Sequence, residues 1–524
     1  MSRWRIGKSS MCPAAAVALL CAAVPCFGDS GPRLRELSVD GTATVGTLRL
    51  PNAVSGAPSA EFAAVDIHHT SPTVPTATVT ADLSAAYRTA GIELIRTHDA
   101  FGAGDIDARF DGGQALGFTI PASRGALTIF PDPNADTESP ASYRFGPTDR
   151  LIASIMGAGA EPLFRIGRSI GAPADPPADP ERYARIVRHI VMHYNGGWDA
   201  GFHYGIRYWE IWNEPDFKFF WNGSAQQFYA LYAAASRAIR AADPAARVGG
   251  PTISGPLEVG AYREGFLDYV RSRHLPLDFF SWHFYTLDSD DPYAFATIAR
   301  EVRKVLDGHG FRKVPSFLDE WNADLFDRDM SVASRASFVA NALIDMARAP
   351  IDLQVFYRAD RHFRGAGGEP DAVAEVLSEY GALRRSPLLL RCAGGDDAGL
   401  GMIAGRSKDG RTIRILISNY QIPARYLGPR PGGDRLHIPN VMEVQLPARR
   451  AVQYTNNGGY SLSIHVPAHT SWRVRRARID EASGYRSVDD AEHSGPQIHL
   501  SAALPPPGVE FITLQEQPQG GGPF

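Results

Sequence analysis

The sequence contains few cysteines. There are four in 524 residues, and three of them, Cys12, Cys21 and Cys26, lie close to the N-terminus. If that region is removed as a leader, only Cys392 remains, which excludes an internal disulfide and a cysteine-based zinc site. The fold must therefore be stabilised by its hydrophobic core, and the 44% of hydrophobic residues is the share of an ordinary soluble globular protein.

A large net charge and a membrane-length hydrophobic run are also lacking. The net charge of −4 offers no electrostatic attraction to nucleic acid or to an anionic membrane surface. The apolar run at residues 13–24 is shorter than the roughly 20 residues of a membrane-spanning helix. It follows basic residues and precedes small ones near Gly28, which is typical of a signal peptide. We expect residues 1–28 to be cleaved and the protein to be secreted or periplasmic.

Two further kinds of motif are missing. No glycine-rich phosphate loop follows the first predicted strand, which argues against an open, doubly wound sheet. We found no histidines and carboxylates grouped at the spacing of metal ligands, so we expect no metal and no cofactor.

Residues 59–385 alternate strand-like runs with amphipathic segments of helical length, a pattern typical of parallel strands with helical crossovers. The expected strands are residues 62–68, 92–98, 162–167, 206–212, 247–251, 279–285, 316–321 and 353–358. Among the expected helices is 225–242, with Ser224 as its N-cap. Eight such pairs predict an α/β fold, the (β/α)8 or TIM barrel.

The flanking segments predict a second domain. Residues 386–515 contain short strands separated by Gly, Asn and Pro, which is typical of a β-sandwich. Residues 29–58 are strand-like and are expected to pack on that domain, and residues 516–524 form a flexible tail. The segment 101–143 far exceeds a usual βα connection of about 2–6 residues. It is either a wall of the active site or an insertion without such a role.

Two glutamates carry the chemistry that the sequence predicts. Glu214 follows the fourth predicted strand, and Glu320 lies near the end of the seventh. Strand ends of a barrel meet at one face, so these carboxyls should face each other. Such a pair can cleave a glycosidic bond, with retention of configuration if the two lie about 5–5.5 Å apart. Asp319 is the rival of Glu320, although strand alternation would turn it to the opposite side.

Several motifs in order resemble glycoside hydrolase family 39, within the clan of retaining barrel enzymes. They are THD at 97–99, EPLF at 161–164, WNEPD at 212–216, VGGP at 248–251, DFFSWHFY at 278–285 and DEWN at 319–322. The resemblance extends over about residues 64–383. It implies a glycosidase in which Glu214 is the general acid/base and Glu320 is the nucleophile.

The resemblance also implies sugar-binding residues. Asn213 would bind the sugar 2-hydroxyl, and His283 and Tyr285 would line the sugar site, with Tyr285 holding Glu320 ionised. The remaining predicted substrate contacts are His98, Asp99, Trp321, His68 and Arg358.

The eighth predicted strand departs from the family pattern. Xylosidases of the family tend to have Trp and an acidic pair there, whereas this chain has Arg358, Arg361 and Arg364. These arginines either bind the carboxylate of a uronic sugar or make loop contacts. We predict a retaining, β-xylosidase-like glycosidase that acts on a plant or bacterial oligo- or polysaccharide. The alternatives are a uronidase or exopolysaccharide-degrading glycosidase, and a barrel that binds carbohydrate without cleaving it.

Overall fold

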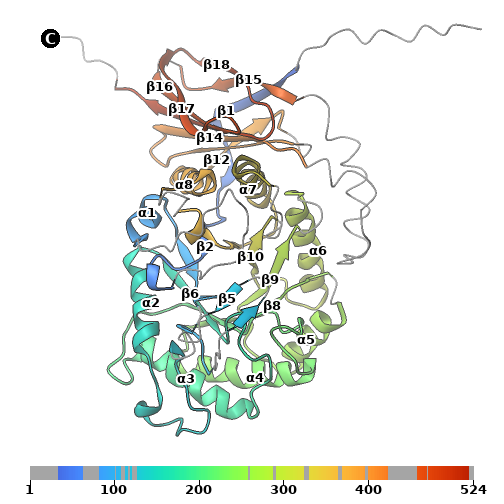
Figure 1. Ribbon diagram of the computed structural model, residues 1–524. Helices are drawn as coiled ribbons and strands as arrows, with labels where there is room; N and C mark the ends of the chain where they lie inside the picture. Colours follow the sequence, from blue (N-terminus) through green and yellow to red (C-terminus); the bar gives the residue numbers. More distant parts are fainter. Residues whose placement is uncertain are drawn as a thin grey trace, which may run out of the picture.

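The computed structural model of the chain describes residues 33–62, 82–100, 102–107, 113–115, 118–120, 127–257, 260–286, 291–323, 330–363, 369–395, 399–422, 457–468 and 470–518. Within these residues, eight parallel strands close into a barrel in the order β10-β11-β2-β3-β6-β7-β8-β9 (Figure 1). The predicted (β/α)8 fold is therefore confirmed. The strands are β2 (Ala53–Ser55), β3 (Leu94–Arg96), β6 (Glu161–Ile166), β7 (Tyr208–Ile211), β8 (Arg247–Ile253), β9 (Phe279–Tyr285), β10 (Ser316–Asn322) and β11 (Leu353–Phe356).

Helices alternate with these strands along the chain and surround the barrel in Figure 1. They are α1 (Ser84–Thr89), α2 (Gly146–Gly157), α3 (Pro180–Gly196), α4 (Ala225–Ala242), α5 (Gly260–Ser272), α6 (Ala294–Gly308), α7 (Val332–Met346) and α8 (Ala372–Arg384). Helix α4 begins as predicted, because Ser224 and Gln227 form a capping box. The reciprocal bonds satisfy backbone N–H groups that the first turn of a helix leaves unpaired.

The first strand of the barrel is not the one predicted. Its position is taken by β2, residues 53–55, which pairs with β3 and β11. Of the predicted strand 62–68, Phe62 ends a 3-10 turn (Ala60–Phe62), and the remainder lies outside the described residues. The barrel thus begins before the expected boundary at residue 59. A three-residue strand gives too short a run for periodicity to identify.

The barrel interior is layered from apolar to polar. Near the starts of the strands, a buried cluster fills the interior with Ala53, Leu94, Leu163, Phe279, Phe317, Leu353 and Val355. Alternation brings the residue two positions later on a strand to the same face. Two positions after Leu94, Leu163, Phe279 and Phe317 come Arg96, Arg165, Ser281 and Asp319, and Glu210 follows Tyr208, which packs against the cluster. All five of these polar residues are buried. A charged layer therefore lies directly above the apolar one, toward the strand ends.

The long segment 101–143 is described only in part. Asp105 forms an isolated bridge with Gly167 after β6, and its carboxylate accepts a hydrogen bond from Arg165 at 2.7 Å. Farther along, the Tyr143 ring packs on His189 of α3. Residues 113–115 (β4) and 118–120 (β5) form an antiparallel hairpin. One described end of this segment is thus attached to the end of β6, and the other packs on helix α3.

The second domain is a nine-stranded sheet in the order β17-β16-β19-β14-β13-β12-β1-β15-β18. Its pairings are antiparallel except for β1 with β15. One buried cluster contains residues from near both edges, such as Trp472 of β16 and Ile498 of β18, so the sheet curls around a single core. The strands are β1 (Arg33–Thr47), β12 (Leu388–Ala393), β13 (Leu400–Arg406), β14 (Thr412–Asn419), β15 (Asn457–His465), β16 (Ser471–Asp480), β17 (Gly484–Ser494), β18 (Gln497–Ala503) and β19 (Gly508–Glu516).

The sheet packs on α7 and α8 of the barrel (Figure 1). Leu416 and Phe511 on this side of the sheet belong to the same hydrophobic cluster as the barrel. At the interface, the buried Asn341 side chain of α7 donates a hydrogen bond to Ser418 Oγ at 3.0 Å. The two domains therefore share one continuous apolar core with a satisfied polar contact inside it.

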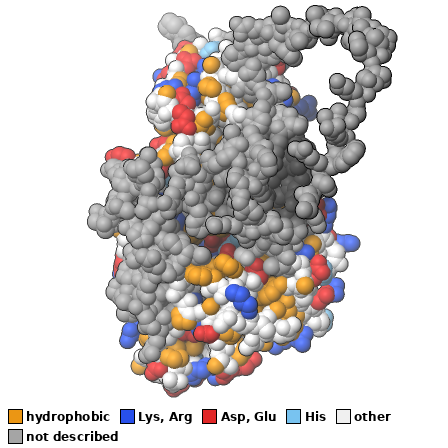
Figure 2. Space-filling view, turned by 45° about the vertical axis from the view of Figure 1, so that its right-hand side comes forward, with side chains coloured by type: hydrophobic (Ala, Val, Ile, Leu, Met, Phe, Trp, Pro, Cys, Tyr) orange, Lys and Arg blue, Asp and Glu red, His pale blue; other side chains and the backbone are white. Residues whose placement is uncertain are grey.

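The surface matches the low net charge. Acidic and basic side chains are interspersed over the part of the barrel visible in Figure 2, together with hydrophobic ones. None of the helices in the described ranges is long and apolar enough to cross a membrane.

Candidate active site

Glu214 lies just beyond the end of β7, in a backbone that is fixed by neighbouring strands. The Trp212 N–H donates to Ile166 O at 2.7 Å, and the Glu214 N–H donates to Thr252 O at 2.9 Å. Trp212 and Glu214 have φ angles of 76° and 43°. L-residues rarely adopt this left-handed conformation, and it is concentrated at functional sites. The backbone thus holds the Glu214 carboxyl at the barrel mouth.

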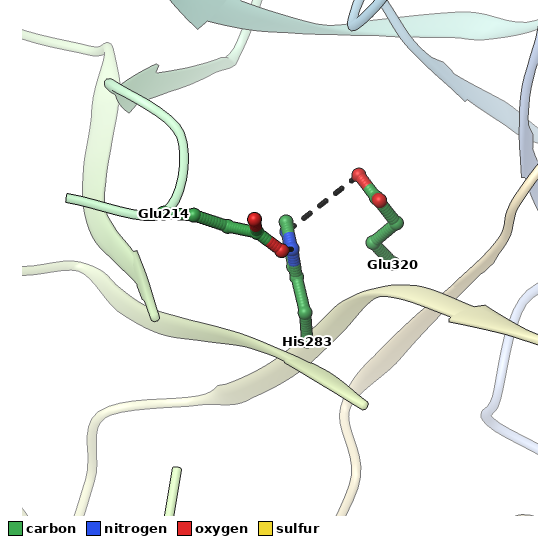
Figure 3. A group of neighbouring side chains, drawn as sticks. All are labelled: Glu214, His283 and Glu320. Atoms are coloured by element: carbon green, nitrogen blue, oxygen red, sulfur yellow. Dashed lines mark hydrogen bonds and ion pairs between the residues drawn. The ribbon is translucent and has the colours of Figure 1, made fainter. Parts of the chain in front are cut away.

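Glu214 and Glu320 face each other with His283 between them (Figure 3). His283 Nδ1 lies 2.8 Å from Glu214 Oε1, and His283 Nε2 lies 3.8 Å from Glu320 Oε2. One oxygen of each carboxyl and one nitrogen of His283 all lie within 4.8 Å of one another. Both glutamates are largely buried, with exposed fractions of 9% and 6%. The structure therefore brings together two carboxyls that lie about a hundred residues apart in the sequence.

A buried arginine, which the sequence analysis missed, connects the strands below this pair. Arg96 on β3 donates from Nε to Glu210 at 2.7 Å, from Nη1 to Glu320 at 2.8 Å and from Nη2 to Asn213 at 2.8 Å. A guanidinium group can make such contacts because it carries donors in a rigid fork. The sequence offered one sign of this role, a charged residue that directly follows apolar residues within a predicted strand.

A β-bulge in β10 brings adjacent carboxyls to one side. Leu318 pairs with Trp282 and Glu320 pairs with His283, so two steps along β10 match one step along β9. The extra residue cancels the alternation expected between neighbours. Asp319 lies 3.7 Å from His283 Nε2 and Glu320 lies 3.8 Å from it. The prediction that Asp319 would face away from Glu320 was therefore wrong.

Tyr285 and Arg96 stabilise charge on Glu320. The Tyr285 hydroxyl donates to Glu320 Oε1 at 2.5 Å, and Arg96 donates to Oε2. Burial raises the pKa of Glu320 to about 7, while the contacts with Arg96 and Tyr285 oppose the rise. Of the two catalytic candidates, Glu320 thus has the cation and the two donors that favour a carboxylate.

Glu214 lies in the opposite electrostatic environment. Burial raises its pKa well above the usual range, and the negative charge of Glu320 raises it further. Its neighbour His283 stays neutral, because burial and then Arg96 lower the pKa of the imidazole. The site can therefore hold a protonated carboxyl and a carboxylate side by side, which is the arrangement that acid-assisted displacement requires.

The end of β3 supplies two of the predicted substrate residues. The His98 ring is buried, with Nε2 4.0 Å from Glu320 Oε2, and its Nδ1 has no hydrogen-bond partner among the described residues. Asp99 accepts hydrogen bonds from Ile170 N at 2.9 Å and from Tyr357 Oη at 2.7 Å. His98 thus keeps a polar atom available, whereas the carboxylate of Asp99 ties loops together.

Three other predicted contacts are not supported or not described. Trp321 follows the bulge, and its side chain points out of the barrel toward Phe295 of α6. The indole is fully buried there and donates a hydrogen bond to Gln354 Oε1 at 2.6 Å. The guanidinium of Arg358 is buried against the Asp360 carboxylate, at 2.7 and 3.0 Å. The predictions that Trp321 and Arg358 contact the sugar were therefore wrong, because both side chains are buried against protein partners. His68 lies outside the described residues, as does Arg364.

Metal binding has one candidate that the sequence analysis overlooked, the pair His189 and His193 on α3. Their spacing is that of metal ligands on one helix face. His193 contacts Asp149 Oδ1 at 3.1 Å and Trp198 O at 2.9 Å, and His189 contacts Arg185 O at 2.9 Å. Both rings thus have protein partners. Among the described residues, Glu214, His283 and Glu320 also bring three potential ligand atoms together. The Arg96 cation 2.8 Å from Glu320 would repel a metal ion bound there.

Parts of the sequence are similar to known glycoside hydrolases. Residues 127–353 match the sequence model of glycosyl hydrolases family 39. Two β-xylosidases align with parts of the chain. The one from Caldicellulosiruptor saccharolyticus is 29% identical over 182 residues, 31% of this chain and 35% of the relative. The one from Geobacillus stearothermophilus is 30% identical over 135 residues, 22% of this chain and 26% of the relative. The matches thus span about a third or less of these relatives' lengths.

Solved structures resemble the whole chain. A glucosidase from Croceicoccus marinus has a TM-score of 0.78 and 33% identity, over 93% of this chain and 100% of that chain. A GH39 enzyme from Xanthomonas axonopodis pv. citri has a TM-score of 0.63 and 16% identity, over 94% and 99% of the two chains. The latter likeness concerns the fold alone.

Proposed function

Because the chain belongs to family 39 of the glycosyl hydrolases, we propose that it is a glycosidase that cleaves with retention of configuration. Glu214 donates a proton to the leaving oxygen, and Glu320 attacks the anomeric carbon to form a glycosyl-enzyme. Glu214 then removes a proton from water, which releases the sugar and restores both carboxyls.

The observation that carries this proposal is the spacing of the two carboxyls. Oxygen atoms of Glu214 and Glu320 lie within 4.8 Å of each other. Retaining enzymes place the groups about 5–5.5 Å apart, whereas inverting enzymes separate them by about 6.5–9.5 Å to admit a water molecule. The different environments of the two carboxyls support the division of roles, because Glu320 has two donors and Glu214 favours its proton.

Unpartnered polar atoms support a sugar site beside this pair. Arg96 binds the Asn213 side-chain oxygen, so the amide nitrogen points elsewhere. That nitrogen is buried and has no partner among the described residues. We assign it to the sugar 2-hydroxyl, a contact that strengthens in the transition state of such reactions. His98 Nδ1 also lacks a partner among the described residues, so it can form a hydrogen bond with another sugar hydroxyl.

We propose β-xylosides or β-glucosides as the substrate class. Xylosides are suggested by the two β-xylosidases, and glucosides by the likeness to a glucosidase over the whole chain. A uronide is less well supported, since Arg358 already forms an ion pair with Asp360.

The test compares the wild-type chain with Glu214→Ala and Glu320→Ala on nitrophenyl xylosides, glucosides and uronides. Exposed Glu181→Ala serves as the control, with wild-type activity expected. Azide should restore turnover of both glutamate variants, giving a glycosyl azide of retained configuration with Glu214→Ala and of inverted configuration with Glu320→Ala. Release of an inverted sugar by the wild-type chain would refute retention.

Binding without cleavage is the competing function. Equal sugar binding by the wild-type chain and both glutamate variants, with no turnover of any glycoside, would establish it. We further propose that the protein is exported, on the basis of residues 1–28. Expression in a bacterium with an intact export system, followed by mass measurement of the mature chain, tests this proposal.

A further inference from the structure

Three buried carboxyls, one of which is Glu320 of the catalytic pair, share one positive charge. Arg96 Nε lies 2.7 Å from Glu210 and 3.5 Å from Asp319, and Arg96 Nη1 lies 2.8 Å from Glu320. His283 also faces Asp319, at 3.7 Å, and its imidazole is neutral because burial lowers its pKa. Glu210 and Asp319 are 0% exposed. Three carboxylates would leave two uncompensated negative charges at a buried site, a state so costly that a group takes up a proton instead.

The hydrogen bonds identify the carboxyl that takes up this proton. Glu210 and Glu320 each accept a hydrogen bond from Arg96. Neither oxygen of Asp319 has a donor among the described residues, and Glu210 Oε1 also lacks one. A proton on Asp319 supplies a donor where a carboxylate would have none. The side chains of Asp319 and Glu210 lie within hydrogen-bonding reach of each other.

We propose that Asp319 is a positioning residue that keeps its proton in the working enzyme and donates it to Glu210. Two unpartnered acceptors are then satisfied by one O–H···O bond, and the charge of Arg96 is left to Glu210 and Glu320. Burial, together with the charge of Glu210, raises the pKa of Asp319 well above its usual range, in accord with this state. Asp319 itself touches no substrate. Its neutrality keeps its neighbour Glu320 ionised, so the inference depends on the proposed role of Glu320.

A pH profile separates a neutral Asp319 from a charged one. Asp319→Asn keeps the shape, remains neutral and can donate an amide N–H to Glu210. If Asp319 is protonated, the acidic limb of kcat/KM should stay within about 0.3 pH units of wild type, and kcat/KM within about three-fold. If Asp319 is ionised, its replacement removes a negative charge beside Glu320, and the limb should fall by more than about one pH unit. That fall would overturn the proposal.

Infrared spectroscopy at pH 8 gives a readout that does not depend on catalysis. Glu214→Gln removes the neighbouring carboxyl, whose pKa burial and the charge of Glu320 raise well above its usual range. The carbonyl band of a protonated carboxylic acid should persist in Glu214→Gln and lose the intensity of one carboxyl group when Asp319→Asn is added. Absence of the band in Glu214→Gln would overturn the proposal even if Asp319→Asn failed to fold. Failure of the proposed function would show differently, as a wild-type chain that cleaves no glycoside while keeping the band.

Discussion

Replacement of Arg96 by Met should damage both stability and catalysis, because this side chain is the cation of a buried network. It is 1% exposed and bonds to Glu210, Glu320 and Asn213. Removing one member of a buried ion pair typically costs about 3–5 kcal/mol, since the partner charge is left uncompensated. We expect Arg96→Met to lower the free energy of unfolding by about that amount.

The effect on catalysis follows from the charge that Glu320 loses. An opposite charge about 4 Å away at an effective dielectric constant near 20 contributes about 4 kcal/mol, which would move a pKa by about 3. The pKa of Glu320, already raised to about 7 by burial, should therefore rise further. The acidic limb of kcat/KM should move upward by one to about three pH units, and activity at pH 7 should fall by roughly 5- to 500-fold as the ionised fraction of Glu320 drops.

Two further variants separate charge from folding. Arg165→Met removes a buried arginine paired with Asp105 at 2.7 Å, which should lower stability and leave the acidic limb in place. Arg96→Lys keeps the charge and loses the three-way fork, so the limb should stay near wild type while kcat falls. The measurements are urea unfolding and pH–rate profiles. An acidic limb of Arg96→Met within about half a pH unit of wild type would refute the reasoning.

Four other outcomes are expected. The kcat/KM of the wild-type chain should decline as pH falls through about 7, because buried Glu320 must be ionised; a pH–rate profile that stays flat down to pH 5 would contradict this. In urea unfolding, the free energy of unfolding of Asp319→Asn should increase relative to that of the wild type as pH rises from 5 to 8. The reason is that a carboxyl with a raised pKa keeps a proton in the folded state that the unfolded state has released; equal differences at both pH values would oppose it. Trp321→Phe should lower stability by about 1–3 kcal/mol through the unpaired Gln354 acceptor, with KM changed less than about two-fold, as measured by thermal unfolding and steady-state kinetics. Asn213→Ala should reduce kcat/KM roughly 10²-fold or more for ordinary glycosides and much less for 2-deoxyglycosides, and equal losses on both would argue against the 2-hydroxyl contact.

Strong periodic signals made much of the barrel predictable. Helix 225–242 has a capping box and a clear apolar face, and strand 279–285 is a run of aromatic residues, so the bounds of both agree with the structure. The strand at 53–55 has only three residues and gave no such signal. The positions of Glu214 and Glu320 at strand ends followed from barrel geometry, in which all strand ends meet at one face.

The network around the two glutamates could not be predicted from one sequence. Arg96 bonds to Glu320 across 224 residues of chain, and no local pattern reports such a pairing. The bulge in β10 was equally invisible, because an extra residue in one strand becomes apparent only beside its partner strand. Without the bulge, alternation assigned Asp319 to the wrong side. The order of the motifs therefore identified Glu214 and Glu320, whereas the charges that surround them became apparent only from the three-dimensional structure.

The position of β1 has a consequence for the order in which the domains can assemble. This strand lies between β12 and β15 in the sheet, but residues 48–387, which include the barrel, leave the ribosome before either neighbour does. During synthesis, β1 therefore remains unpaired until β12 and β15 have been made, while the barrel strands become available in succession. Deletion of β1 would remove the strand that joins β12 to β15 in the nine-stranded sheet. The two domains therefore cannot be separated by cutting the chain once.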